Sequence, residues 1–291
     1  MIVLRIEGGL GNIMFQYALG RHLSLTNHLP LKFDVESCLI NPLGDYSLSL
    51  EAFNINIHDN LATPSEIKYF KRYQRKTGHY AFLHNFLIAD KTRYIQEYKP
   101  CFQSEVLSSA DNIYLHGWWQ NEKYFIDSRK TLLDDFTVQT PIEGQNFLTA
   151  ELIRTLESVA IHVRRADYVT NPKTKQYHGE LTYDYYKEAL NRITFLIPNP
   201  TLFIFSDDIP WVKKNFPFSF ETVYIEWNSD APHEDMRLMN LCKHHIIANS
   251  SFSWWGAWLA RSPNQIVVAP DRWTQDPRDL NERVPARWIR I

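Results

Sequence analysis

The second half of the chain alternates short apolar runs with helix-like stretches, and this alternation limits the available folds more than any other feature. We expect strands at 159–163, 202–206, 222–226, 244–248 and 265–269, separated by helices. Repeated strand–helix units with short apolar strands predict a doubly wound parallel sheet. The first half opens in the same way, because the apolar run Ile2–Ile6 leads through a glycine-rich turn into a helical pattern.

The chain is therefore expected to hold two Rossmann-like α/β domains that face each other across a cleft. We place them at residues 1–145 and 146–291, with a C-terminal tail that packs back on the first domain. A further strand is expected at 31–35 and another from Ile113, whereas 41–113 is read as helices and loops. Within that segment a tract rich in Tyr, Lys and His, Lys68–Tyr98, has local helical character and no clear motif.

Composition excludes several classes of protein. Lys and Arg number 31 against 33 Asp and Glu, and no block of like charges stands out, so nucleic acid is not expected as a partner. Three widely spaced cysteines indicate neither a disulfide framework nor a zinc site, and fit a reducing cytoplasm. No run approaches the roughly 20 apolar residues of a spanning helix. We expect a cytoplasmic protein without a transmembrane anchor, and leave open peripheral contact at the inner face of the membrane.

A charged cluster follows the expected strand 159–163. His162, Arg164, Arg165 and Asp167 lie at its carboxyl end, where open α/β sheets bind ligands. Paired arginines can hold a diphosphate through bidentate hydrogen bonds, so we predict an anion site, with surface or interdomain ion pairs as the alternative. Because side chains alternate along a strand, Arg164 shares a face with His162 and is the expected phosphate ligand. Arg165 is expected to pair with Asp167 as structural support.

Polar residues also follow two other strands of the second half. Asp207 and Asp208 come after 202–206, where a carboxylate can accept hydrogen bonds from a nucleoside or cap the next helix. After 244–248 the chain offers small donors at a helix start, which favours a phosphate site over capping alone: Asn249, Ser250, Ser251 and Ser253.

In the first half, two stretches could contact a ligand. Gly9, Gly11 and Asn12 lie between a strand and a helix, where backbone N–H groups can approach a phosphate or a sugar; a tight packing turn is the alternative. The second stretch could line an acceptor pocket, although tryptophan packing at a domain junction explains it equally well: Trp118, Trp119, Gln120 and Glu122.

No Asp-x-Asp pair occurs in the chain. Enzymes that hold a nucleotide sugar through a divalent metal commonly need paired carboxylates, so arginines and helix termini would have to neutralise the leaving group. This absence favours a metal-independent, two-domain glycosyltransferase.

Four motifs together resemble those of the α-1,2-fucosyltransferase family, especially its bacterial members. They keep the family's order and approximate spacing, and the resemblance extends from residue 8 to about residue 273. The motifs are Gly8-Gly9-Leu10-Gly11-Asn12-Ile13-Met14-Phe15-Gln16-Tyr17-Ala18, His162-Val163-Arg164-Arg165-Ala166-Asp167-Tyr168, Phe205-Ser206-Asp207-Asp208 and Asn249-Ser250-Ser251-Phe252-Ser253-Trp254-Trp255-Gly256.

The resemblance implies a GT-B-type fold and an inverting transfer of L-fucose from GDP-fucose to the 2-hydroxyl of a terminal galactose, with no metal or other cofactor. It implies an acceptor side in 1–145 and a donor side in 146–291. By the same resemblance, Arg164 contacts the β-phosphate, and His162 with Asp207 or Asp208 approaches the guanine nucleoside. The diphosphate would lie on the segment from Asn249, held by Ser250, Ser251 and Ser253, and the donor would be covered by Gly9, Gly11 and Asn12.

Two departures from the family pattern affect the expected chemistry. Ile13 stands where the family usually has Gln. Related α-1,6-fucosyltransferases place a glutamate a few residues after the position of Asp167, and this chain has none there. The first candidate for the catalytic base is Asp167, with Glu122 second; an ion pair that orients Arg165 is the alternative for Asp167. Rival functions are another GDP-sugar transferase on the same fold and a non-catalytic nucleotide-sugar or glycan-binding protein.

Overall fold

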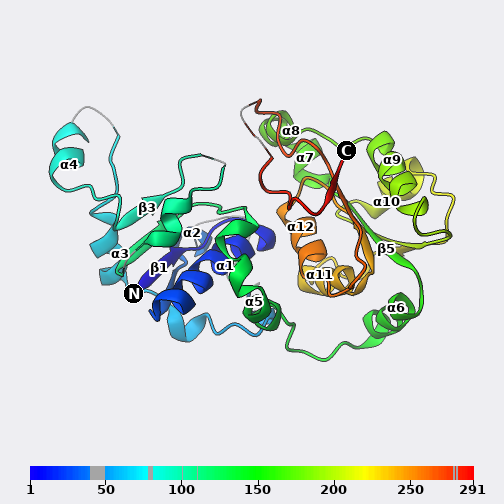
Figure 1. Cartoon of the computed structure of the whole chain (residues 1–291), viewed down its shortest axis with the longest axis horizontal. Coiled ribbons are helices and arrows are strands. Elements are labelled where there is room, and N and C mark those ends of the chain that lie inside the picture. The colour runs from blue at the N-terminus through cyan, green and yellow to red at the C-terminus, as the bar shows by residue number, and fades with distance from the viewer. Residues whose placement is uncertain (40–49, 78–80, 100, 110, 278, 280) are drawn as a thin grey trace. The chain divides into compact units, whose positions relative to one another are not determined.

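A computed structural model describes residues 1–39, 50–77, 81–99, 101–109, 111–277, 279 and 281–291. The chain divides into two compact units, Met1–Gln139 (unit 1) and Thr140–Ile291 (unit 2) (Figure 1). Residues 140–145, which we assigned to the first domain from the sequence, belong to unit 2 and include the start of a helix at Gly144.

Unit 1 is built on a parallel four-stranded sheet in the order β2-β1-β4-β3. Its strands are β1 (Ile2–Arg5), β2 (Leu31–Asp34), β3 (Tyr94–Gln96) and β4 (Ile113–His116). Its helices are α1 (Leu10–Asn27), α2 (Glu36–Leu39), α3 (Pro64–Lys71), α4 (Ala81–Leu87) and α5 (Arg129–Asp135), with 3-10 turns η2 (His58–Asn60), η3 (Ser104–Ser108), η4 (Glu122–Tyr124) and η5 (Ile126–Ser128). The strands expected at the start of the chain, near residue 31 and from Ile113 are all present.

Unit 2 holds a parallel six-stranded sheet in the order β10-β9-β8-β5-β6-β7. Its strands are β5 (Ser158–Val163), β6 (Thr201–Ser206), β7 (Thr222–Ile225), β8 (His244–Ile246), β9 (Val267–Ala269) and β10 (Ile289–Arg290). The order is that of a classical dinucleotide-binding sheet, with the first strand in the middle and the next strands added on either side. The sequence predicts five of these strands; β10 is too short to show a pattern. Packing of the C-terminal tail on the first domain stays a prediction.

Helices of unit 2 cover both faces of this sheet. They are α6 (Gly144–Thr155), α7 (Ala166–Thr170), α8 (Pro172–His178), α9 (Tyr183–Thr194), α10 (Ile209–Asn215), α11 (Pro232–Leu241) and α12 (Ser251–Trp258). Val159 and Ile161 of β5 pack with α9 and α10, whereas Ala160 packs with α6 and α11. Because both faces are buried, β5 has to be apolar at nearly every position.

Among the described helices, none combines the length and the hydropathy that a membrane-spanning segment requires.

Gly256 is a point of close contact between α12 and α11. A Cβ built there would lie 2.6 Å from Cε and 3.1 Å from Cβ of Met239. We expect Gly256→Val to lower the free energy of unfolding by about 1–3 kcal/mol, the usual range for overpacking, which calorimetry would detect as a lower Tm. Gly9→Ser is the matched control, because nothing lies within 4 Å of a Cβ at Gly9. Equal Tm values for the two variants would contradict this view of the α11–α12 contact.

Candidate functional site

The carboxyl edge of the unit 2 sheet brings together the residues singled out in its sequence. β5 lies between β6 and β8, and the chain runs outward from β5 in opposite directions on its two sides. In open α/β sheets, ligands bind outside the carboxyl ends of the strands at such a switch point. Arg164 follows β5, Asp207 follows β6, and Asn249 lies just beyond β8.

Arg164 is oriented at this edge and partly open to solvent. Its Nη1 lies 2.8 Å from Oδ2 of Asp207, its guanidinium lies 5.7 Å from the ring centre of Tyr168, and 32% of its side chain is exposed. Asp207 is itself fixed, because its Oδ1 accepts a 2.8 Å hydrogen bond from the backbone N–H of Arg165. The site therefore presents an oriented, permanently charged donor that an incoming anion can reach.

Arg165 has a different environment. It is buried, with its guanidinium carbon 3.3 Å from the ring centre of Trp211. Its Nη1 lies 2.6 Å from Oε1 of Glu180 and its Nε 3.4 Å from Oδ2 of Asp208. Arg165 thus holds neighbouring segments together, and the partners that the structure describes for it are Glu180 and Asp208. The side chain of Asp167 lies outside the part of the chain that the structure describes, so its pairing and its role stay predictions.

Asp208 also serves as the cap that the sequence offered as its alternative role. Its Oδ1 accepts a 3.2 Å hydrogen bond from the N–H of Trp211 in the first turn of α10. The two aspartates after β6 are therefore used differently: Asp207 orients Arg164, whereas Asp208 caps a helix and pairs with Arg165.

His162 is buried in β5 and uncharged. Burial, reinforced by the charge of Arg164, lowers the pKa of His162 to about 3. Its ring packs against Phe252 with 5.5 Å between ring centres, and its Nδ1 has no hydrogen-bond partner among the described residues. A buried polar atom without a partner is rare in native proteins, so this nitrogen is a candidate for contact with a ligand.

The residues after β8 differ in how their side chains are used. Ser253 is fully buried and its hydroxyl donates to the carbonyls of Ala248 and Ser250, so in this structure that hydroxyl is engaged by the backbone and its contact with a diphosphate stays a prediction. Asn249 is also buried, and its Nδ2 donates to the carbonyls of His178 (2.9 Å) and Trp273 (3.1 Å). The side chain of Asn249 is therefore a structural tie.

Ser250 and Ser251 remain as diphosphate candidates. Ser250 is the N-cap of α12, and its side chain makes no capping hydrogen bond; Ser251 is the first residue of the helix and is half-buried. A helix amino terminus with small hydroxyl side chains provides donors for an anion.

A cavity of about 480 Å³ lies along the same edge, in the range of small-molecule sites. Residues that line it include Glu180, Tyr185, Asn249, Asp271 and Arg272. The sequence-based prediction gave no role to Arg272, although it lies shortly after β9, and polarity after a buried strand is the signal that could have found it. Tyr185 is fixed at the cavity, since its hydroxyl donates to the carbonyl of Ile247 at 2.6 Å.

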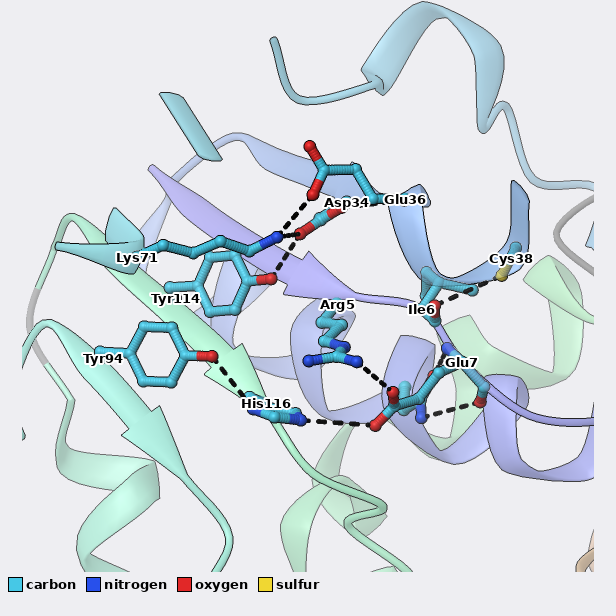
Figure 2. Close-up of polar contacts among 11 residues, drawn as sticks. Arg5, Ile6, Glu7, Asp34, Glu36, Cys38, Lys71, Tyr94, Tyr114 and His116 are labelled. Carbon is cyan, nitrogen blue, oxygen red and sulfur yellow. Dashed lines mark hydrogen bonds and ion pairs between the residues drawn. The ribbon is translucent and has the colours of Figure 1, made fainter. Parts of the chain in front are cut away.

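Unit 1 has a switch point of its own, between β1 and β4. Figure 2 shows Glu7, just beyond β1, between Arg5 and His116. Arg5 Nη2 lies 2.8 Å from Glu7 Oε2, and His116 Nε2 lies 3.5 Å from Glu7 Oε1. The hydroxyl of Tyr94 lies 3.0 Å from His116 Nδ1. The backbone of Glu7 is fixed as well, because Gln16 accepts from its N–H and donates to its carbonyl.

Glu7 is half-buried and ionised at neutral pH. Burial acts to raise the pKa of Glu7, but the hydrogen bond from His116 and the charge of Arg5 outweigh it, so the pKa lies below its usual value. Sequence reading missed this carboxylate. The rule that located Arg164, polar residues at the ends of buried strands, would have found Glu7 and His116 as well.

The glycine turn at Gly8 and the stretch that begins at Trp118 meet beside Glu7. Gly8 has a φ of +86°, and a Cβ there would come within 3.0 Å of Trp118 Cζ3 and Asn12 Nδ2. Gln120 Nε2 donates to Asn12 Oδ1 at 2.7 Å. The side chain of Trp118 is 44% exposed at this edge.

Other residues of these stretches are less exposed than Trp118. Trp119 is buried, and so are Gly11 and Ile13 in the first turns of α1, which removes Ile13 from contact with a ligand. Gly9 is the N-cap of α1, and Glu122 is half-buried in η4. Three buried side-chain nitrogens of unit 1 have no hydrogen-bond partner among the described residues: Arg5 Nε, Asn27 Nδ2 and Trp119 Nε1.

The remaining polar contacts of Figure 2 stabilise the sheet of unit 1. Asp34 ends β2 almost fully buried, and accepts a 2.5 Å hydrogen bond from the hydroxyl of Tyr114. Lys71 Nζ lies 3.2 Å from Asp34 and 2.6 Å from Glu36. A buried carboxylate needs such partners, so this cluster requires no ligand.

Within the described residues, no group of three or more His, Cys, Asp or Glu side chains is placed to hold a metal ion.

Comparison with known proteins identifies the family. The sequence pattern of glycosyl transferase family 11 matches residues 1–291. The chain belongs to this family. It is 33% identical over 303 residues to an alpha-1,2-colitosyltransferase of Escherichia coli, covering 100% of this chain and 99% of the relative. It is 31% identical over 286 residues to the O-antigen biosynthesis glycosyltransferase WbnK of Escherichia coli, with 92% and 93% covered.

More distant relatives match part of the chain, and a solved structure shares its fold. Bovine galactoside 2-alpha-L-fucosyltransferase SEC1 is 30% identical over 159 residues, which are 52% of this family 11 chain and 43% of the bovine protein. A GDP-bound mutant of FUT1 from Arabidopsis thaliana superposes with a TM-score of 0.50 at 12% identity, over 92% of this chain and 70% of that one. The predicted GT-B-type α/β fold is thereby confirmed.

The two arginines should differ in their effect on stability. We expect Arg165→Met to lower the free energy of unfolding by about 2 kcal/mol, less than for a fully buried pair because Glu180 and Asp208 are partly exposed. Arg164→Met, the matched control, should change it by less than about 1 kcal/mol, since Arg164 is a third exposed. Chemical denaturation of both variants measures the difference. A larger loss in Arg164→Met would reverse the roles assigned here.

Proposed function

We propose that this family 11 glycosyltransferase moves L-fucose from GDP-β-L-fucose to the 2-hydroxyl of a terminal galactose, with inversion and without a metal. The observation that carries the proposal is Arg164, oriented by Asp207 at the switch point of unit 2 and open to solvent. The names of the relatives support an α-1,2 linkage. The names of the colitosyltransferase and of one galactoside fucosyltransferase contain alpha-1,2, and the name of another contains 2-alpha.

A second donor has support from one observation. The relative named as a colitosyltransferase matches along its whole length, whereas bovine SEC1 matches over about half of this chain. Colitose is L-fucose without its 3-hydroxyl, so a site for one sugar differs from a site for the other by a single polar group. Transfer of colitose from its GDP derivative is therefore the alternative function.

The proposed chemistry needs a cation where the leaving group gathers charge. As the bond between C1 of the sugar and the β-phosphate oxygen breaks, its electron pair passes to the phosphate, and Arg164 would stabilise that charge. The amino terminus of α12, with Ser250 and Ser251, would add N–H and O–H donors. Neutral His162 and the cavity beside Arg272 are candidates for holding the nucleoside.

The acceptor hydroxyl has to lose a proton while its oxygen bonds to C1. We assign that proton to Glu7, because its carboxylate is ionised and held in place by Arg5, His116 and Gln16. Trp118 lies on the same edge, is partly exposed, and offers an aromatic face to a sugar. Glu122 and Asp167 remain the alternatives.

A product assay tests the function. The protein is incubated with GDP-fucose or GDP-colitose and with β-1,3- and β-1,4-linked galactosides, each without added metal and with a chelator, and the linkage of any product is determined. We expect an α-1,2-linked fucosyl product and undiminished activity in the chelator. A preference for GDP-colitose would support the alternative. Binding of a GDP-sugar without any transfer would contradict both.

Glu7→Gln tests the proton acceptor. Gln keeps the shape of the side chain and can still pair with Arg5, but cannot take a proton. We expect kcat to fall at least about 10²-fold, the lower bound for loss of a general base, with Tm unchanged. The acidic limb of the pH–rate profile should disappear with it. Arg164→Ala should cost a similar factor at all pH values, as for an oxyanion donor.

The control for this assignment is Glu122→Gln, which should keep kcat within about threefold of the unmodified protein. A large loss in Glu122→Gln or Asp167→Asn, combined with normal turnover in Glu7→Gln, would move the proton to that residue instead.

A further inference from the structure

Helix α4 exposes apolar side chains that have no part in the proposed reaction. Phe82 and Phe86 are each 78% exposed and Leu87 is 67% exposed; Ile88 directly after the helix is also exposed. Figure 1 shows α4 projecting from the rest of unit 1. Phe82 and Phe86 lie one turn apart with nearly parallel rings, at an interplanar angle of 8°. We call these four residues the α4 patch. Large apolar groups gathered in this way on a protein surface usually mark an interaction site.

Hydrogen bonds fix which side of α4 faces outward. The side chain of Asn85 donates to the carbonyl of Lys76 and accepts from its N–H, both at 2.8 Å. His84 Nε2 lies 3.0 Å from the carbonyl of Gln74. The polar side of the helix is thus tied to the segment that follows α3, and the opposite, apolar side is left to solvent. The exposure of the α4 patch follows from these contacts.

The α4 patch lies within the most basic part of the chain. Between residues 68 and 93 there are seven Lys and Arg and one Asp, whereas the rest of the chain has 24 Lys and Arg against 32 Asp and Glu. The basic residues are spaced singly or in pairs, so no run of like charge marks the segment. Five of them are exposed: Lys68, Arg72, Arg75, Lys76 and Lys91.

We propose that the α4 patch and its surrounding cations bind the surface of an anionic lipid bilayer. Aromatic and aliphatic side chains on a short helix can enter the boundary between headgroups and acyl chains. Nearby Lys and Arg add roughly 1 kcal/mol each through the negative potential of anionic lipids. The combination of exposed apolar groups with a local positive charge matches that surface in both respects.

The charge distribution disfavours a second copy of the chain as the occupant. In a symmetric dimer the α4 patch would face its own copy, and the exposed cations of the two copies would repel each other. The interaction does not depend on the identity of the sugar, so it can be tested separately from the proposed function.

Vesicle co-sedimentation tests the proposal with the full chain. We expect binding to vesicles of phosphatidylcholine mixed with an equal part of phosphatidylglycerol, and at least tenfold weaker binding to phosphatidylcholine alone or at high salt. Phe82→Ser with Phe86→Ser should reduce binding to the mixed vesicles at least tenfold, and Arg75→Gln with Lys76→Gln should do the same. Neither pair should change Tm or turnover of a soluble acceptor, because these residues lie outside the proposed site.

The matched control is Phe195→Ser with Leu196→Ser. This apolar pair of unit 2 is 88% and 56% exposed and lies outside the basic segment, so its loss should leave vesicle binding unchanged. Equal binding by all variants, or no binding by the unmodified protein, would overturn the proposal. Self-association that is lost in the Phe82/Phe86 variant, without vesicle binding, would overturn it in favour of a second copy.

Discussion

Burial of β5 on both faces is the constraint on which the rest of unit 2 depends. A strand covered by helices on either side disfavours charged side chains along its length, so the buried His162 is held as a neutral ring. The charged side chains therefore follow the end of the strand. Since parallel strands all end at one edge, the same constraint that builds the core concentrates Arg164, Asp207 and the start of α12 in one place.

At that edge, two adjacent residues of one chemical type carry out different tasks. Arg165 turns toward Trp211 and Glu180, where it is enclosed and paired. Arg164 turns toward Asp207 and keeps a third of its side chain in water. Alternation along the backbone separates them, and the immediate surroundings decide the outcome. An account based on residue type alone would have treated the pair as equivalent.

The sequence predicts the layout well and the individual contacts less well. Apolar runs locate β5 and its neighbours, because burial on both faces leaves a continuous pattern. Short elements such as β10 leave none. Strand-end polarity points to Arg164, but residue type alone cannot reveal that Ser253 donates its hydroxyl to the carbonyls of Ala248 and Ser250, just before its own helix. Nor can it reveal that Asn249 ties distant loops, since no local pattern brings those segments together. Glu7 shows the reverse case. A polar residue directly after a buried strand is visible in the sequence, but its pairing with His116 of β4 is visible only in the structure.

The tie made by Asn249 has a consequence for how a ligand would be received. One amide group holds the carbonyls of His178 and Trp273, while its own backbone carbonyl accepts from Tyr168. These segments, far apart in the sequence, are therefore held together in the folded protein. The conformational entropy lost in ordering them is lost on folding and not on ligand binding. A ligand that binds here meets segments that are already ordered, so little of its binding free energy is needed to order them.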